Sequence, residues 1–362
     1  MSRIVIDWRD RGSTGRYAAK LLKYLQQLDR RNQYFVLVKS TQDWQPTAPN
    51  FQAVPADVKD YTFAEQFKLW WIIRRLKPDL VHFTMPQQPL LYTGPAVTTI
   101  HDLTMLRWHN PTGNKWVYRG KLFTYRCLLW WVAHTSDRLI TPTAWVKADV
   151  VSTLKVDPVR IRVTHLAAEA IRGKTEIPPG FDRQTKFIFF NGNVFPHKNV
   201  EGLIQAFIRL KPKYPELRLV IAGKLNSRGE ELKLKTSLST IIDWLGFVPD
   251  TQLKWLLTHA QVYVYPSFSE GFGLPGLEAM NAGTPLASSN ATCLPEIYGL
   301  AAEYFDPNST EDMAEAIDRL LSDKRRRREL LKFEREQMKK YSWRRTAEQT
   351  LEVYTHVLNM ND

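Results

Sequence analysis

The segment from Val264 to Gly283 holds two glutamates in a setting suited to an anionic, hydroxyl-rich ligand. Glu270 lies in a loop of serines and glycines after an apolar, strand-like run, and Glu278 follows eight positions later in a helical stretch that begins near Leu274 and Pro275. Glycines let the backbone approach a ligand closely. A helix N-terminus offers unpaired N–H groups and a partial positive charge to a phosphate. Carboxylates accept hydrogen bonds from hydroxyls, so this segment predicts a phosphate site flanked by two hydroxyl-binding glutamates.

A second cluster is the run Asn191–Asn199, with the letters NGNVFPHKN. A strand leads into a glycine turn, and Lys198 follows at the predicted start of a helix. A lysine at that point can neutralise a diphosphate as a point charge. Asn193 stands directly after the glycine, and we interpret His197 as a surface residue.

The run Ile100–Leu106 places His101 and Asp102 at the end of a predicted strand. Strand ends of open α/β sheets border the ligand crevice, so both side chains are candidates for the site. A single histidine at a strand end is more often structural, and the pattern alone gives His101 no role as a general base.

The fourth candidate is the glycine loop Asp10–Tyr17, with the letters DRGSTGRY. Gly12 and Gly15 allow backbone approach to a phosphate or an acceptor, and Arg16 adds positive charge. The loop lacks the G-x-G-x-x-G pattern, which disfavours dinucleotide binding.

The four segments together resemble the retaining GT-B glycosyltransferases, particularly family 4 (glycosyltransferase group 1). The pair Glu270 and Glu278 resembles the family's two glutamates separated by seven residues. The resemblance implies that Glu270 contacts hydroxyls of the transferred sugar and that Glu278 contacts the ribose. It also implies that the backbone at Phe272, Gly273 and Leu274 holds the diphosphate.

The Lys198 segment resembles the family's G-[RN]-x-x-P-x-K-[GN] motif. Many members carry an arginine where this chain has Asn193, so one cationic contact is missing or comes from elsewhere. A subgroup with asparagine there contains many mannosyltransferases. The resemblance therefore favours GDP-mannose as donor, with UDP- and dTDP-sugars left open.

The N-terminal segments resemble the donor-facing and acceptor-facing parts of the same family. The resemblance implies that His101 orients the donor sugar and acts with Lys198 and Glu270 in catalysis, while Gly15 lies on the donor side. Gly12, Arg16 and Asp102 are implied on the acceptor side.

The fold expected is α/β: GT-B, with two Rossmann-like domains facing across a cleft and the C-terminal helix crossing back to the first domain. The predicted domains are 1–169 with about 342–362, for the acceptor, and 170–341, for the donor. The boundary rests on Pro178, Pro179 and Gly180, a composition typical of a linker.

Alternating strand-like and helix-like segments support this class. Predicted strands are 3–7, 34–39, 79–83, 96–101, 138–141, 186–191, 217–222, 260–265 and 284–288. Predicted helices are 16–28, 63–77, 114–133, 199–210, 253–259, one from 274, a highly charged helical stretch over 311–340, and a closing one over 341–354. Cys293 is expected in the core, and Trp343 as a packing anchor.

Charge is uneven along the chain. Of a net +13, residues 1–169 hold 24 Lys and Arg against 13 Asp and Glu, and they also hold nine of the twelve tryptophans. The runs 63–77 and 115–133 mix tryptophan with lysine and arginine. Such helices suit an anionic membrane surface, and the alternative is an aromatic core with a solvated charged face.

No metal-ligand cluster is evident, and two cysteines make no disulfide framework. We therefore expect a hexosyltransferase that needs no metal and no cofactor, with a nucleotide sugar as donor and a glycan or lipid-linked acceptor in surface polysaccharide or glycolipid synthesis. Retention follows from the resemblance, by front-face displacement. The expected location is cytoplasmic, either free or at the inner face of the membrane. The alternatives are a nucleic-acid-binding protein, for which no motif is found, and a non-catalytic sugar-nucleotide-binding protein.

Overall fold

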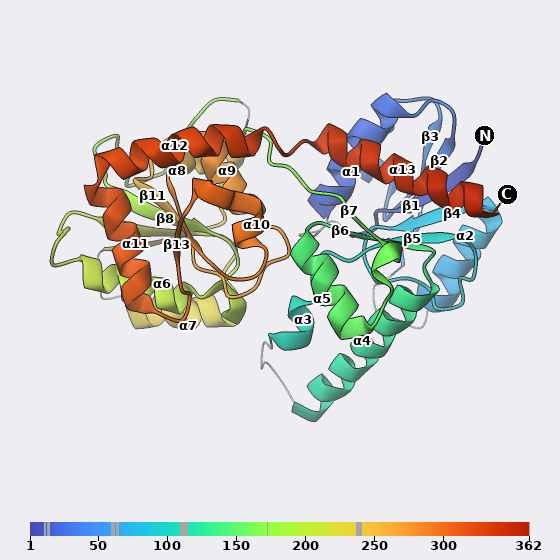
Figure 1. Ribbon diagram of the computed structural model, residues 1–362, viewed down its shortest axis with the longest axis horizontal. Coiled ribbons are helices and arrows are strands. Elements are labelled where there is room, and N and C mark those ends of the chain that lie inside the picture. The colour runs from blue at the N-terminus through green and yellow to red at the C-terminus, as the bar shows by residue number, and fades with distance from the viewer. Residues whose placement is uncertain are drawn as a thin grey trace. The chain divides into compact units, whose positions relative to one another are not determined.

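The computed structural model describes residues 1–10, 12, 15–58, 62, 65–108, 115–171, 173–236 and 241–361. The chain divides into two compact units, each built on one parallel sheet (Figure 1). The first unit comprises Met1–Arg107, Pro111–Leu166 and Ser342–Asp362, and the second comprises Trp108–Asn110 and Ala167–Tyr341. Among the described residues, no helix has the length and apolar character needed to cross a membrane.

The first unit has a seven-stranded sheet in the order β3-β2-β1-β4-β5-β6-β7. Every strand pair in it is parallel, as expected for strands joined by helical crossovers. Its strands are β1 (Arg3–Asp7), β2 (Gln33–Val38), β3 (Phe51–Pro55), β4 (Leu80–Phe83), β5 (Ala96–Thr99), β6 (Arg138–Thr141) and β7 (Ile161–Val163).

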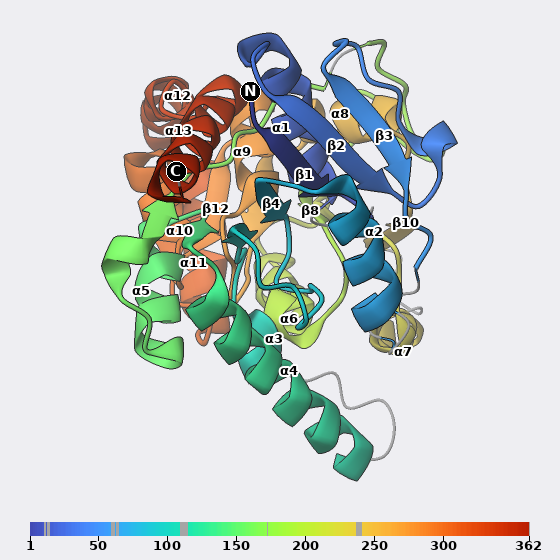
Figure 2. The ribbon, with the colours of Figure 1, turned by 90° about the vertical axis from the view of Figure 1, so that its right-hand side faces the viewer.

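Helices surround this sheet, and the last helix of the chain is one of them (Figure 2). They are α1 (Gly15–Leu28), α2 (Trp70–Leu76), α3 (Thr104–Arg107), α4 (Lys115–Thr135), α5 (Ala144–Leu154) and α13 (Trp343–Asn361). Helix α13 packs on α1, and its buried positions recur at helical spacing from Trp343 to Val357. Tyr354 bonds the ring of His82 on β4, with 2.6 Å between Oη and Nδ1. The predicted return of the C-terminal helix to the first domain is confirmed, and Trp343 is buried.

The second unit has a six-stranded sheet in the order β10-β9-β8-β11-β12-β13, again parallel throughout. Its central strands are continuous apolar runs because helices cover both faces. Its strands are β8 (Phe187–Asn191), β9 (Arg218–Ala222), β10 (Ile242–Gly246), β11 (Val262–Tyr265), β12 (Leu286–Ser289) and β13 (Glu303–Phe305).

The helices of the second unit form two layers, with α6, α7 and α11 on one face of the sheet and α8, α9 and α12 on the other (Figure 1). Their bounds are α6 (Val200–Leu210), α7 (Ser227–Thr236), α8 (Asp250–His259), α9 (Leu274–Ala282), α10 (Leu294–Tyr298), α11 (Thr310–Ser322) and α12 (Lys324–Met338). The two parallel-sheet domains predicted from the sequence are thereby confirmed.

Two predicted helices differ in detail. The stretch predicted to be helical over 311–340 is divided into α11 and α12, because Asp323 leaves the helical conformation and its side chain accepts hydrogen bonds from the N–H groups of Arg325 and Arg326. The helix expected over 63–77 begins as a π-helical turn, Glu65–Leu69, before α2. Its first two residues, and Asn114 of the next predicted helix, lie outside the described residues.

Candidate active site

The strand order of the second sheet reverses between β8 and β11, which makes their carboxyl ends a topological switch point. Three strand ends lie close together there. Gly192 N–H donates to the Ala222 carbonyl at 2.9 Å, and Gly223 N–H donates to the Gly246 carbonyl at 2.7 Å. Gly223 has φ +135°, and a Cβ on it would lie 2.2 Å from the Gly192 carbonyl oxygen. Only glycine fits at position 223, so bare backbone lies at the ends of β8 and β9.

Lys198 and Glu270 lie in the segments that follow β8 and β11, the two strands that flank this switch point. Lys198 ends a 3₁₀ turn, Pro196–Lys198, that follows β8, and Glu270 lies in the loop after β11. The two loops are tied by a hydrogen bond of 2.7 Å from Phe268 N–H to the His197 carbonyl. Lys198 Nζ lies 2.6 Å from Glu270 Oε1, with side chains 19% and 11% exposed. The structure therefore brings together two candidates that are 72 positions apart in the chain.

Several groups act on the pKa of Glu270. Burial raises it, but the charge and hydrogen bond of Lys198, together with the Ser267 hydroxyl and the His197 charge, bring it below the ordinary value. Lys198 Nζ also lies 5.7 Å above the Tyr265 ring. The site thus holds an ionised carboxylate and an ammonium in a half-sheltered crevice, a donor–acceptor pair suited to sugar hydroxyls and phosphate oxygens.

The segment after β12 forms hydrogen bonds to the backbone of Glu270. Glu270 N–H donates to Thr292 Oγ1 at 3.2 Å, and the Cys293 thiol donates to the Glu270 carbonyl at 3.2 Å. Cys293 is fully buried, as expected, and burial raises the pKa of its thiol. The sequence did not indicate that these two residues support the glutamate loop.

Helix α9 starts at this same edge. Phe272 is buried, and Gly273, at φ +90°, precedes Leu274, the first helical residue. The Tyr298 hydroxyl donates to the Gly273 carbonyl at 2.6 Å, and a Cβ on Gly273 would lie 2.4 Å from that hydroxyl oxygen. No side chain caps the start of α9, so its N–H groups and helix dipole suit a phosphate.

Glu278 lies on α9, and Asn193 lies in the loop after β8. Glu278 is half-buried on α9, and its charge adds to the burial that raises the pKa of Tyr263 on β11. Tyr263 in turn donates to Asn191 Oδ1 at 2.6 Å, at the end of β8. Asn193 is exposed in the loop after β8.

The first sheet has its own switch point, between β1 and β4. The predicted glycine loop follows β1: Gly12 N–H donates to Asp10 Oδ1 at 2.9 Å, and Gly15 N–H donates to the Gly12 carbonyl at 3.1 Å. Gly15 is buried, and Arg16 is exposed in the first turn of α1. Residues 11, 13 and 14 of this loop lie outside the described part of the chain.

His101 follows β5 and points its ring toward the end of β4. Its Nε2 lies 3.0 Å from the Thr84 carbonyl, and its ring meets Tyr17 edge-on at 4.9 Å between centroids. A carbonyl only accepts, so Nε2 carries the proton. Burial lowers the pKa of His101, although the Thr84 carbonyl and the charges of Asp102 and Asp10 oppose that effect. Asp102 accepts a 2.8 Å hydrogen bond from Thr104 N–H and so caps α3.

A buried ionic cluster that was not predicted from the sequence lies beside Thr84. Arg9 is 3% exposed, and its Nη2 lies 2.9 Å from both Asp7 Oδ2 and Glu65 Oε1. Asp7, Arg9, Asp10, Thr84, Met85 and Gln87 line a small polar hollow. The signal in the sequence was the charged run WRD directly after a buried strand.

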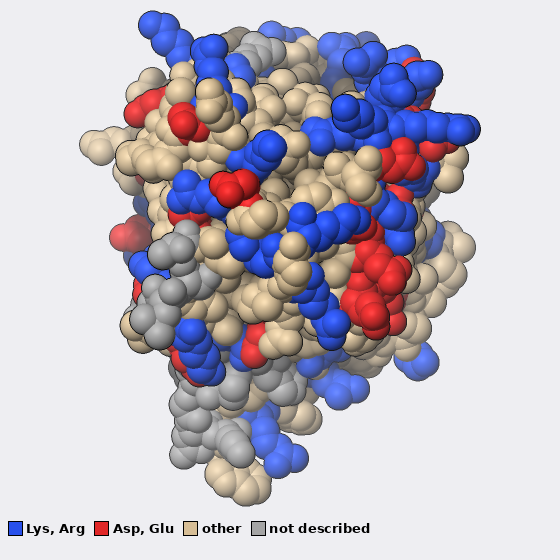
Figure 3. All heavy atoms as spheres, turned by 90° about the vertical axis from the view of Figure 1, so that its left-hand side faces the viewer, with Lys and Arg blue, Asp and Glu red and all other residues tan. Residues whose placement is uncertain are grey.

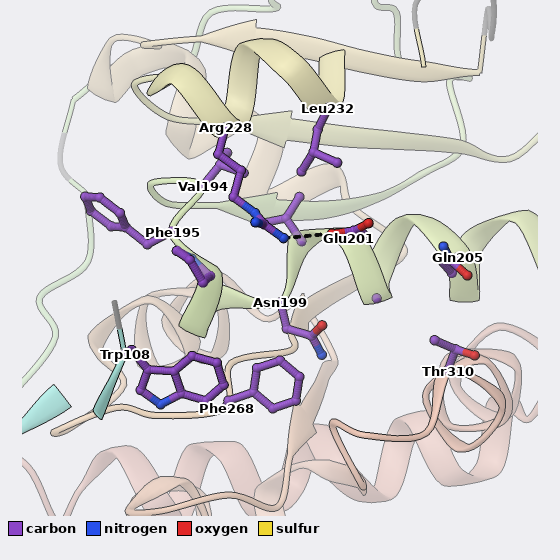
Figure 4. A pocket seen from close by; sticks show the side chains of 13 residues that line it. Trp108, Val194, Phe195, Asn199, Glu201, Gln205, Arg228, Leu232, Phe268 and Thr310 are labelled. Carbon is purple, nitrogen blue, oxygen red and sulfur yellow. Dashed lines mark hydrogen bonds and ion pairs between the residues drawn. The ribbon is translucent and has the colours of Figure 1, made fainter. Parts of the chain in front are cut away.

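A larger cavity of about 340 Å³ lies on the α6 and α7 side of the Lys198 loop (Figure 4). Trp108 belongs to the second unit, and its ring stacks on that of Phe268 with 5.0 Å between centroids. Arg228 Nη2 lies 2.8 Å from Glu201 Oε2. Val194 and the residues after it form part of its wall, so this cavity adjoins the same loops. Within the described residues no group of three or more His, Cys, Asp or Glu side chains could hold a metal ion.

Comparison with known proteins agrees with this architecture. A family profile described as "Glycosyl transferases group 1" matches residues 172–337, and one described as "Glycosyltransferase Family 4" matches residues 14–168. Among solved structures, the sucrose-phosphate synthase of Thermosynechococcus elongatus superposes with a TM-score of 0.78 at 17% identity, covering 99% of this chain and 100% of that one.

Curated relatives include two proteins of Escherichia coli. The O-antigen chain mannosyltransferase B is 28% identical over 315 residues, covering 83% of this chain and 80% of that protein. The serotype-specific mannosyltransferase WbdA is 34% identical over 182 residues, covering 48% of this chain but only 22% of that longer protein. With profiles matched on both halves and the GT-B architecture in place, the chain belongs to the group 1, family 4 glycosyltransferases.

Proposed function

We propose that this protein transfers mannose from GDP-mannose to a glycan or lipid-linked acceptor in surface polysaccharide or glycolipid synthesis, with retention of configuration. The single observation that carries the proposal is the Lys198–Glu270 pair at the β8/β11 switch point, beside the start of α9. The choice of mannose is supported by the two mannosyltransferase relatives.

The proposed donor pose follows from the charges at this edge. The diphosphate would lie against the α9 N-terminus at Phe272, Gly273 and Leu274, where no side chain caps the helix and the helix dipole is positive. Lys198 would turn from Glu270 to the diphosphate, which frees the Glu270 carboxylate to accept from hydroxyls of the mannose. Glu278, further along α9, would accept from the ribose.

The proposed reaction is a front-face displacement. The acceptor hydroxyl oxygen forms a bond to the anomeric carbon while the bond from that carbon to the β-phosphate oxygen breaks. The acceptor proton passes to the leaving phosphate oxygen, so no protein base is needed. Lys198 and the α9 amides stabilise the charge that develops on the diphosphate, which is where such groups lower a barrier most. His101, with its pKa lowered, would orient the donor sugar as a neutral hydrogen-bonding group.

The first unit would bind the acceptor at the carboxyl ends of β1 and β4. Asp10 and Gln87 line a small polar hollow there, and His101 lies beside Thr84. Such groups recognise sugar hydroxyls. The glycine loop with Gly12, Gly15 and Arg16 borders the same strand end.

A transfer assay tests the proposal. The purified protein is incubated with radiolabelled GDP-mannose, UDP-glucose or dTDP-glucose and a membrane glycolipid extract, with Lys198→Met and Glu270→Gln as site variants and Glu216→Gln as the exposed control in the same unit. We expect label transfer from GDP-mannose by wild type and Glu216→Gln only. Transfer from UDP- or dTDP-sugars alone would assign a different donor to the same site, and full activity in both site variants would refute the proposed site.

A further inference from the structure

Helix α4, Lys115–Thr135, is anchored to the first unit only near its C-terminal end. Leu129, Val132 and Ala133 are buried, whereas the described side chains from Trp116 to Leu128 are exposed or half-buried. Figure 2 shows this helix extending away from the rest of its unit. Most of the described side chains from Trp116 to Leu128 are therefore open to solvent, although Tyr125 packs against the core of the first unit.

Large aromatic side chains stand on this extended part. Trp116 is 77% exposed, Phe123 is 69% exposed and Trp130 is 52% exposed. The alternative that the aromatic residues of this segment form core is therefore wrong for these three. Exposed aromatic groups gathered on one element mark a binding surface rather than packing.

The spacing of these residues puts them on one face. Trp116, Phe123 and Trp130 are seven residues apart, which is two helical turns, and Arg119 and Arg126 fall between them at steps of three and four. All five side chains are exposed. We call this row the aromatic–arginine stripe; at 1.5 Å per residue it is about 21 Å long. The Arg119 guanidinium lies 5.5 Å above the Trp116 ring, so charge and aromatic surface are interleaved along the stripe.

The charge of the helix selects the partner. The sequence Lys115–Thr135 contains four Lys and Arg residues and no Asp or Glu. By contrast with α4, the face of the molecule drawn in Figure 3 carries Asp and Glu among its Lys and Arg residues. A second copy would bring like charges together along the stripe, which is unfavourable. An anionic phospholipid surface attracts the cations and accepts the aromatic rings at the depth of its headgroups.

We propose that the aromatic–arginine stripe of α4 docks the first unit on the surface of a bilayer that contains anionic phospholipid. The helix lies flat, with its arginines at lipid phosphates and Trp116, Phe123 and Trp130 between the headgroups. This inference deepens the proposed function, because it places the acceptor-binding unit where a lipid-linked acceptor resides.

Vesicle sedimentation tests the inference with the full chain. Wild type is mixed with vesicles of phosphatidylcholine alone or with phosphatidylglycerol added, and tryptophan emission is recorded in parallel. We expect binding only to vesicles with phosphatidylglycerol, weakened by salt, with a blue shift of the emission. Arg119→Glu/Arg126→Glu should reduce the affinity by ~30-fold or more, since each basic residue near the surface contributes about 1 kcal/mol. Trp116→Ser/Phe123→Ser should reduce binding and the blue shift.

The matched control is Arg325→Glu/Arg328→Glu on α12, which makes the same charge change at two exposed arginines of the second unit. It should bind vesicles like wild type. Unfolding curves establish that each variant is folded. Equal binding by stripe and control variants, or no binding by wild type to either vesicle, would overturn the inference. So would binding of wild type to oligonucleotides in preference to vesicles, or a wild-type dimer that the stripe variants lose.

Vesicle binding requires no donor and no transfer. A protein that binds vesicles but shows no response to nucleotide sugars would therefore contradict only the proposed function. A protein that responds to a nucleotide sugar but ignores vesicles would contradict only the docking surface.

Discussion

Lys198 Nζ and Glu270 Oε1 lie 2.6 Å apart at the carboxyl ends of two neighbouring strands, each residue carried by a different loop. Each side chain neutralises the other. Burial raises the pKa of Glu270, but Lys198, together with the Ser267 hydroxyl and the His197 charge, brings it below its ordinary value. In the proposed donor complex, the diphosphate would compete for the lysine, and sugar hydroxyls would replace the lysine at the glutamate.

Removing one partner should cost more stability than removing both. Lys198→Met leaves the Glu270 carboxylate sheltered and unpaired, so we expect the free energy of unfolding at neutral pH to fall by about 1–3 kcal/mol. Lys198→Met/Glu270→Gln should recover most of that loss, while transfer activity stays absent in both. Denaturant unfolding measures the first effect, and a single variant as stable as wild type would contradict it.

The same pair predicts that the free energy of unfolding falls as the pH is lowered. The pKa of Glu270 is lower in the folded than in the unfolded protein, so its contribution is present above the ordinary value of 4.5 and is lost as the pH falls through the folded pKa. Wild type should lose this contribution on acidification, and Glu270→Gln should not. Unfolding curves collected from pH 7 down to pH 3 compare the two proteins, and parallel pH profiles would exclude the predicted linkage.

Glu334 should act in the opposite direction. It is 2% exposed on α12, and burial raises its pKa to about 9 although the Arg327 charge and the Leu286 backbone N–H oppose this. Because the folded pKa lies above the unfolded one, this contribution is present below pH 4.5 and is lost as the pH rises toward 9. Between pH 4.5 and 7 the loss is on the order of 3 kcal/mol.

Glu334→Gln should therefore raise the free energy of unfolding at pH 8 relative to wild type and flatten its dependence on pH. Glu336→Gln, two positions later and exposed, is the control and should change neither quantity. Denaturant unfolding at several pH values gives the comparison. A lower stability for Glu334→Gln at pH 8 would show that the carboxylate is ionised and paired in the folded protein.

Gly273→Ala should disrupt the start of α9. Its φ of +90° and the Tyr298 hydroxyl at 2.4 Å from the added Cβ leave no room for a side chain. We expect weakened nucleotide binding together with a loss of stability of ~1–3 kcal/mol. Tyr298→Phe removes the hydrogen bond but keeps the ring, so it should bind nucleotide better than Gly273→Ala does. Calorimetric titration distinguishes them, and unchanged affinity in Gly273→Ala would argue against a phosphate at this helix start.

Metal dependence separates the proposed chemistry from a metal-assisted one. If Lys198 and the α9 amides stabilise the leaving diphosphate, transfer should continue in the presence of EDTA at an undiminished initial rate. Proton NMR of the product should show the anomeric configuration of the donor. Complete loss of activity in EDTA, restored by a divalent cation, would contradict the proposal.

The fold was predictable because apolar strands and periodic helices alternate clearly along the sequence. Apolar runs such as Phe187–Asn191 and Arg218–Ala222 read as buried parallel strands, and the helices between them have clear periodicity. Short edge strands escaped: Ile161–Val163 is three residues long, with only Ile161 buried. The break at Asp323 was visible in principle, since Asp precedes the charged start of α12 as an N-cap residue does.

Candidate residues could be named from the sequence where chemistry and spacing coincide in one segment. Glu270 and Glu278 fall together because one loop and one helix carry both. The contact between His101 and the Thr84 carbonyl, and the pairing of Arg9 with Glu65, join elements far apart in sequence. No local pattern encodes such contacts, since they arise only once the strand order is known. The functional roles of all candidate residues remain predictions to be tested.

The most direct measurement is the melting temperature of the protein with GDP, UDP, dTDP, ADP and their sugar conjugates, in wild type, Glu278→Gln and the control Glu216→Gln. A ligand that binds only the folded state must raise the melting temperature. We predict a rise with GDP and GDP-mannose in wild type and Glu216→Gln that is lost or strongly reduced in Glu278→Gln. No rise with any nucleotide, or an equal rise in Glu278→Gln, would contradict a donor site at the end of β11.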